Sequence, residues 1–142
     1  MSMILALLAA GSAAAATPAD VIGRWKAESR GGVIEITECG QSICGRLVSS
    51  DGLKENPSLK DVNNKDESLR SRPLKNLTIL KGFERKKDEW SGGSIYNAED
   101  GGTYKATITM QDANHLKLKG CIVWPLCKTQ TWTRIRYALK DI

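Results

Sequence analysis

Apolar and polar side chains alternate with a period of two along most of this chain. The alternation is clearest over residues 103–110 and 115–122, where every second side chain is apolar or glycine and most of its neighbours are Thr, Lys or His. A period of two is typical of strands with one buried face. Residues 111–114 separate the two segments, which predicts a hairpin.

Other stretches of the same kind, bounded by Gly, Asn or Asp, predict further strands. They cover residues 21–28, 33–38, 43–49, 76–83, 89–96 and 128–137. Eight antiparallel strands joined mainly by short turns favour an all-β fold, a single up-and-down barrel that leaves no open edge and can hold one small ligand. A β-sandwich is the alternative.

The one long connection covers residues 50–73 and is rich in polar side chains. Loops of this length are often functional lids or mobile segments. Its acids suggest calcium, but an EF-hand loop counted from Asp61 needs glycine at the sixth position, where Asp66 stands. We therefore expect a solvated excursion with one helical turn around residues 67–70.

Residues 1–16 carry no charged side chain and pass from an apolar stretch into small residues. This pattern predicts a signal peptide cleaved near Ala16, which leaves one domain over residues 17–142 in the periplasm or outside the cell. A stable membrane anchor would need about 20 apolar residues and is not expected. The formal net charge is +5, but export and the mixing of lysines with acids disfavour nucleic acid as a partner.

The four cysteines form two close pairs, Cys39 with Cys44 and Cys121 with Cys127. Four cysteines allow three pairings. Each close pair flanks a predicted turn, so the simplest arrangement is two disulfides that each close one hairpin tip. A metal site is the alternative, although the spacings differ from C-x-x-C and His115 lies in another turn.

Short motifs are spread over residues 17–142. They are Ile22-Gly23-Arg24-Trp25, Cys44-Gly45-Arg46, Asp61-Val62-Asn63, Leu69-Arg70-Ser71-Arg72-Pro73-Leu74, Trp90-Ser91-Gly92-Gly93-Ser94-Ile95-Tyr96, Asp100-Gly101-Gly102-Thr103-Tyr104, Leu116-Lys117-Leu118-Lys119-Gly120-Cys121 and Thr129-Gln130-Thr131-Trp132-Thr133-Arg134. Together they resemble the DUF2147 family of exported bacterial proteins. The resemblance implies a lipocalin-like, calycin-type barrel and supplies no catalytic residues, because no biochemical activity is generally assigned to the family.

The chain departs from the family pattern at Asn76, where glycine is frequent, and at Gly102, where lysine is frequent. Neither departure threatens the fold, because Asn tolerates a left-handed backbone and Gly102 lies in a turn. The resemblance also implies that the tryptophan of Gly23-Arg24-Trp25 closes one barrel end and that Arg134 covers it. Gly23, Trp25, Trp132 and Arg134 are accordingly expected to be structural.

Catalytic chemistry finds little support in the sequence. Ser91 has no neighbouring histidine in a recognisable motif, and His115 lies at a hairpin end. Among Glu28, Glu35 and Glu38, Glu35 shares a strand face with Val33 and would be a candidate if it pointed inward, although outward faces ordinarily carry such charges. We expect no enzyme activity, no cofactor and no metal.

A binding protein fits better, because a calycin-type barrel provides a cup. The expected inward positions, which are candidates for ligand contact or for ordinary core packing, are Trp90, Tyr96, Tyr104, Ile108, Leu116 and Leu118. The hypothesis is that a small apolar or amphipathic molecule occupies the barrel mouth, gated by the loop at 50–73.

A second hypothesis concerns the five apolar residues between Cys121 and Cys127. If exposed, Val123, Trp124 and Leu126 would form a rigid tip for contact with a protein or a membrane, as in an envelope interaction or inhibitor module. A homodimer belongs to this class. The alternative is that the segment folds back and plugs one barrel end.

Overall fold

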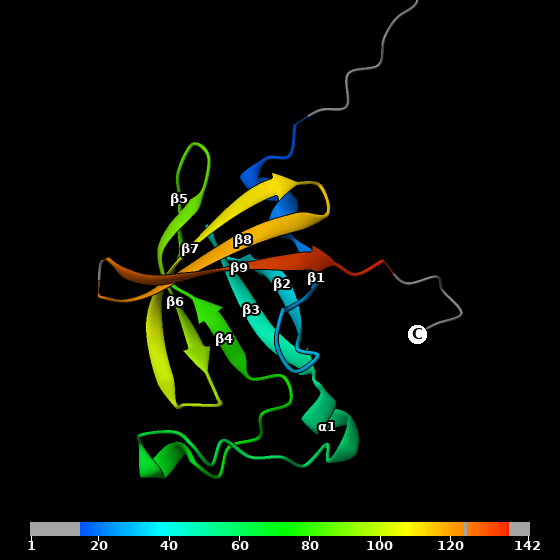
Figure 1. Cartoon of the computed structure of the whole chain (residues 1–142), viewed down its shortest axis with the longest axis vertical. Coiled ribbons are helices and arrows are strands. Elements are labelled where there is room, and N and C mark those ends of the chain that lie inside the picture. Colours follow the sequence, from blue (N-terminus) through cyan, green and yellow to red (C-terminus); the bar gives the residue numbers. More distant parts are fainter. Residues whose placement is uncertain (1–14, 124, 137–142) are drawn as a thin grey trace, which may run out of the picture.

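The structure is a computed structural model that describes residues 15–123 and 125–136. This part of the chain holds nine β-strands, one short α-helix and two 3-10 helices (Figure 1). The strands are β1 Gly23–Lys26, β2 Val33–Cys39, β3 Ser42–Ser49, β4 Thr78–Lys81, β5 Glu84–Arg85, β6 Trp90–Asn97, β7 Gly102–Asp112, β8 His115–Val123 and β9 Leu126–Arg134. The helices are η1 Pro18–Val21, α1 Asp51–Glu55 and η2 Glu67–Leu69.

The strands form one antiparallel sheet in the order β4-β3-β2-β1-β9-β8-β7-β6-β5, and a further pairing of β4 with β6 closes it. The predicted eight-stranded up-and-down barrel is therefore confirmed. β5 is an additional strand that pairs with the start of β6. Its two residues, Glu84 and Arg85, are both exposed, so no alternation reveals it in the sequence.

Each predicted strand overlaps an observed one, with differences at the ends. The first strand starts later than predicted because Pro18–Val21 forms η1. The strand predicted at 76–83 shrinks to β4, since Asn76 has a left-handed backbone with φ 65°. This is the position where the family often has glycine. The last strand ends at Arg134, and residue 137 lies outside the described residues.

The alternation of side chains fills the barrel with a single apolar cluster. Because successive residues of a strand point to opposite faces, the strand residues in this cluster come from the inward-facing positions. Its buried members are Val21, Trp25, Ile34, Ile36, Ile43, Leu80, Phe83, Trp90, Ala106, Ile108, Leu116, Leu118 and Trp132.

Antiparallel strands place successive turns at opposite ends of the barrel. One end, here the η1 end, carries η1 and the connections at 40–41, 82–89 and 113–114. The other, the loop end, carries the connections after β1, β3, β6 and β8, including the long segment with α1 and η2 (Figure 1). Over residues 15–123 and 125–136, no helix is long and apolar enough to cross a membrane.

Candidate functional site: the loop end of the barrel

The η1 end of the barrel is closed by hydrogen bonds from two buried indoles. Trp25 Nε1 donates to the carbonyl oxygen of Val21 at 2.8 Å, and Trp90 Nε1 donates to that of Pro18 at 2.8 Å. The guanidinium of Arg134 lies 4.3 Å from the centre of the Trp25 ring. Trp25 and Arg134 thus adopt the arrangement that the family resemblance implies.

Gly23 leaves room for this arrangement. A Cβ at Gly23 would lie 2.7 Å from Arg134 Nη1, and the φ of 135° at this position also disfavours any residue with a side chain. Trp132 is fully buried nearby in the core cluster. The four residues expected to be structural therefore meet at or near the η1 end.

The middle of the barrel is a packed core. Trp90, Ile108, Leu116 and Leu118, all candidates for ligand contact, are each at most 7% exposed and belong to the buried cluster. Buried groups of this kind already contact one another, as in any protein interior. The structure places these four residues where packing accounts for them.

Towards the loop end the inward side chains become more exposed and more polar. Trp132 Nε1 donates to Gln130 Oε1 at 3.1 Å, so the two side chains point the same way, and Gln130 is only half-buried. Ile95 pairs with Tyr104 across β6 and β7, and both are half-buried. A Cβ at Gly120 would lie 3.8 Å from Ile95 Cγ2 and 3.9 Å from Tyr104 Cβ. A Cβ at this position would therefore meet Ile95 and Tyr104 at ordinary contact distance, without a clash.

The prediction that Tyr96 points into the barrel is wrong. Between Trp90 and Gly93 the register with β7 shifts, so that one extra residue stands in β6. A bulge of this kind reverses the alternation beyond it. Trp90 and Ile95 therefore face the core, whereas Tyr96 lies on the opposite face of β6.

Tyr96 instead contacts a buried carboxylate in the long loop. Its hydroxyl donates to Asp61 Oδ1 at 2.5 Å, while Asn64 Nδ2 and Arg72 Nε each donate to Asp61 Oδ2 at 2.8 Å. Arg72 also lies over the Tyr96 ring at 5.3 Å. We call these four residues the Asp61 cluster. It ties the loop to the barrel wall, so residues 50–73 are not simply a solvated excursion.

The hydrogen bonds of the cluster keep Asp61 ionised. Burial raises the pKa of Asp61, but the donors Tyr96, Asn64 and Arg72 offset this effect, and the pKa is lowered from its ordinary value of 3.8. For Tyr96, burial and the hydrogen bond to Asp61 both raise the pKa above 10.0. The cluster therefore holds one negative charge at neutral pH, balanced by Arg72.

Further contacts fix the loop against two neighbouring turns. Asn63 Nδ2 donates to the carbonyl oxygens of Ala98 and Glu99, each at 3.2 Å. Arg30 Nε lies 3.1 Å from Glu99 Oε1, and the Asp51 backbone N–H donates to the Arg30 carbonyl oxygen at 3.0 Å. The connections at 27–32, 50–73 and 97–101 thus form one linked rim, and the predicted helical turn is present as η2.

The fourth connection at the loop end is the β8–β9 hairpin tip, which projects away from the barrel (Figure 1). Disulfides join Cys121 to Cys127 at this tip and Cys39 to Cys44 in the β2–β3 hairpin, as the simplest pairing predicts. Val123 and Leu126 are 58% and 65% exposed. The described part of the tip therefore does not plug the barrel, and Trp124 lies outside the described residues.

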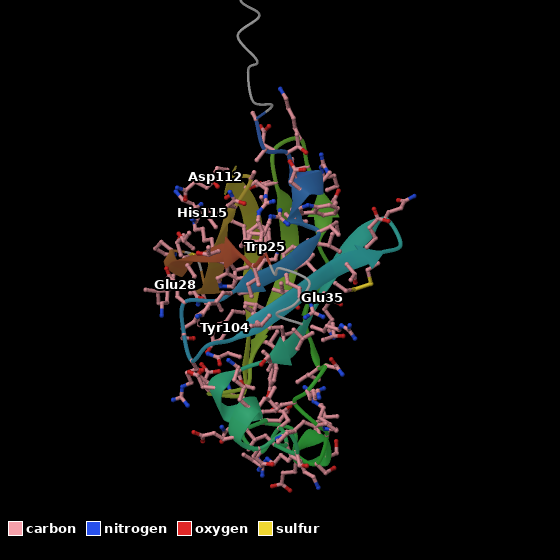
Figure 2. All side chains as sticks on the ribbon, turned by 90° about the vertical axis from the view of Figure 1, so that its right-hand side faces the viewer. Trp25, Glu28, Glu35, Tyr104, Asp112 and His115 are labelled. Atoms are coloured by element: carbon pink, nitrogen blue, oxygen red, sulfur yellow. A yellow bond between two sulfur atoms is a disulfide. The ribbon has the colours of Figure 1, made fainter. Side chains whose placement is uncertain are left out.

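Two of the acidic candidates, Glu28 and Glu35, lie on the outside of the barrel (Figure 2). Glu35 shares a face with Val33, as expected, but that face is the outer one, and Glu35 accepts from Arg46 at 2.7 Å and Arg24 at 2.8 Å. Hydrogen bonds from Arg46 and then from Arg24 lower its pKa. Glu28 accepts from the Thr131 backbone N–H at 3.1 Å, and Glu38 is exposed.

The His115 side chain lies 2.9 Å from Asp112 Oδ1 at the β7–β8 turn. Across residues 15–123 and 125–136, no three His, Cys, Asp or Glu side chains are placed to hold a metal ion. Two shallow depressions open on the surface, one at the η1 end beside Arg134 and one on the outer wall between Lys81 and Lys105. Neither is lined by a member of the core cluster.

Comparisons with known proteins agree on the fold. A solved structure similar to this chain is described as protein HP1028 from the human pathogen Helicobacter pylori, which belongs to the lipocalin family. The identity is 22% and the TM-score 0.71, with 84% of this chain and 93% of that chain covered. No curated protein matches the sequence. The sequence model for uncharacterised proteins conserved in bacteria, DUF2147, matches residues 23–134, and the chain therefore belongs to the DUF2147 family.

Proposed function

We propose that this chain is an exported, non-enzymatic binding protein that holds a small apolar or amphipathic molecule at the loop end of its barrel. The observation that carries the proposal is the change along the inward face from fully buried Trp132 to half-buried Gln130. A lipocalin-like barrel provides the general frame for such a site. The ligand lies beside Ile95, Tyr104 and Gln130, not in the filled middle.

The surrounding side chains indicate which chemical groups such a ligand carries. Ile95 and the Tyr104 ring present apolar surface, whereas the Gln130 amide and the exposed Lys128 on the same strand present polar groups. Small-molecule sites combine an apolar lining with a few polar groups that fix orientation. We therefore favour a molecule with an apolar body and a polar or anionic end.

The Asp61 cluster makes the long loop a fixed rim of this site. A loop that swung open as a gate would have to break the hydrogen bond from Tyr96 of the barrel wall to the buried Asp61 carboxylate, and a lost hydrogen bond to a buried charged group is costly. We expect the loop to shape the entrance without moving. Two disulfides agree with an oxidising compartment, which supports the export part of the proposal.

The first test is native mass spectrometry of the protein purified from the bacterial envelope under mild, oxidising conditions. Denaturing extraction then identifies any released molecule. A stoichiometric adduct supports the proposal and names the ligand class, and the same sample reports whether the chain is a monomer or a dimer.

A matched pair of variants tests the location. Gly120→Leu places a side chain beside Ile95 and Tyr104 and should abolish the adduct without unfolding the barrel. Thr107→Leu adds the same side chain to the outer face, since Thr107 pairs with Lys119, and should leave the adduct intact. An adduct that survives Gly120→Leu would contradict the proposed location.

A further inference from the structure

The β8–β9 tip concentrates exposed apolar side chains. Among the described residues, six large apolar side chains are exposed, and three of them, Ile122, Val123 and Leu126, lie in this tip at 70%, 58% and 65%. On the surfaces of monomeric soluble proteins, exposed apolar side chains usually occur singly. Their grouping at a projecting hairpin end indicates a contact surface.

The charged side chains within this hairpin have a single sign. From His115 to Arg134 the sequence contains Lys117, Lys119, Lys128 and Arg134 and no Asp or Glu. Lys119 and Lys128 are exposed and lie within two residues of the Cys121–Cys127 disulfide. The apolar group is therefore bordered by cations.

The tip is also ordered before it binds a partner. The disulfide joins its two strands where Cys121 pairs with Cys127 in the β ladder, and Val123 pairs with Leu126 beyond it. Groups that are already ordered lose little conformational entropy on binding. Small contacts of this kind can therefore add useful affinity.

We propose that the β8–β9 tip docks on an anionic phospholipid surface. Ile122, Val123 and Leu126 enter the boundary between headgroups and acyl chains, while Lys119 and Lys128 remain at the level of the phosphates. The three exposed apolar side chains in the described part of this tip are by themselves too few for a stable protein interface, which buries about 800 Å² on each partner. A uniformly anionic surface matches cations on both strands of the hairpin, and each adds to the attraction.

Vesicle binding of the full chain tests this proposal. We expect strong binding to phosphatidylcholine vesicles with about 30% phosphatidylglycerol and at least about tenfold weaker binding to pure phosphatidylcholine. Ile122→Ser with Leu126→Ser should lower binding to the anionic vesicles by about tenfold or more. Val62→Ser is the matched control, since Val62 is 66% exposed in the loop at 50–73, and should bind as the wild type does.

A second pair of variants tests the contribution of the lysines to vesicle binding. Lys119→Gln with Lys128→Gln should weaken binding, whereas Lys86→Gln with Lys87→Gln, in the connection at the η1 end, should not. Residues 1–14 are common to every variant, so their contribution cancels in the comparison. Equal binding by the wild type and the tip variant would overturn the proposal. So would a dimer in solution that the tip variant converts to a monomer, because the occupant would then be a second copy.

Discussion

Arg134 of β9 covers the indole of Trp25 of β1, with the guanidinium 4.3 Å from the ring centre. Nε of Arg134 donates to the carbonyl oxygen of Ala113 at 2.8 Å and Nη1 donates to that of Ile22 at 3.0 Å, while Nη2 donates to that of Asp20. One side chain thus connects β1, β9, η1 and the β7–β8 turn.

Replacing Arg134 should therefore cost more than a surface arginine usually does. For Arg134→Ala we expect a loss of about 2–4 kcal/mol in the free energy of unfolding, from the cation–ring contact and the charged hydrogen bonds. Urea unfolding followed by circular dichroism measures it. Arg136→Ala is the control, because Arg136 donates to the Asn114 side chain at the surface, and should cost at most about 1 kcal/mol. Equal losses for both variants would contradict the role given to Arg134.

The Asp61 cluster predicts a second loss of stability. Asp61→Asn removes the charge that balances Arg72 but keeps the shape of the side chain, so we expect a loss of about 2–3 kcal/mol at neutral pH. The one-third exposure of Arg72 keeps the loss below that of a fully buried pair. Hydrogen exchange should show faster opening of residues 50–73 than of the barrel strands.

The same variant predicts a pH dependence. Because the folded state lowers the pKa of Asp61 below 3.8, its stabilisation is complete above that value and disappears as the pH falls through the lowered pKa. The difference in unfolding free energy between wild type and Asp61→Asn should stay constant from about pH 5 to 8 and shrink below about pH 4. A difference that already shrinks near pH 6 would mean that burial dominates and that the pKa is raised.

Two glycines in the barrel should respond oppositely to alanine. At Gly93 a Cβ would lie 2.5 Å from the Phe83 ring, so Gly93→Ala should destabilise the protein by about 1–3 kcal/mol through overpacking. At Gly120 the nearest atom would be 3.8 Å away, and Gly120→Ala should be neutral or stabilise by about 0.5–1 kcal/mol. Thermal unfolding of both variants checks the ordering, and the reverse order would contradict the packing described.

The two disulfides should contribute equally to the stability of the protein but unequally to vesicle binding. Each closes a short loop, so replacing Cys39 and Cys44, or Cys121 and Cys127, with serine should cost about 2 kcal/mol. Vesicle binding should weaken only for the second pair, because only that disulfide orders the β8–β9 tip. If both variants changed vesicle binding by the same amount, the order of the β8–β9 tip would not be what determines binding.

The sequence pattern predicts the barrel well because alternation reports directly which face of a strand is buried. It fails where a register shift changes the phase. Tyr96 illustrates this failure, because the extra residue between Trp90 and Gly93 depends on how β6 pairs with β7. For Glu35 the alternation leaves open which face is the inner one, and the pairing with Arg24 and Arg46 on the outer face decides it.

The Asp61 cluster shows a second limit. In the sequence, Asp61 and Asn64 stand in a polar stretch typical of a solvated loop, yet both are buried. Tyr96, 35 residues later, supplies one of the hydrogen bonds to Asp61. Only the fold brings these groups together, and a pattern of neighbouring residues carries no trace of it. By contrast, the disulfides follow the simplest pairing that local spacing suggests. The sequence leaves open whether the β8–β9 tip is exposed or plugs the barrel, and the fold decides this for the described residues of the tip.

The contact between the first and last strands has a consequence for the timing of folding. Arg134 reaches the carbonyl of Ile22, 112 residues earlier in the chain. At about 5–20 residues per second, roughly 6–20 s of synthesis separate the two. During that interval β1 lacks one neighbour and Trp25 lacks its cover, so the barrel cannot close on the ribosome until β9 has emerged. The contact that closes the barrel therefore forms among the last, only after the whole strand sequence has been synthesised.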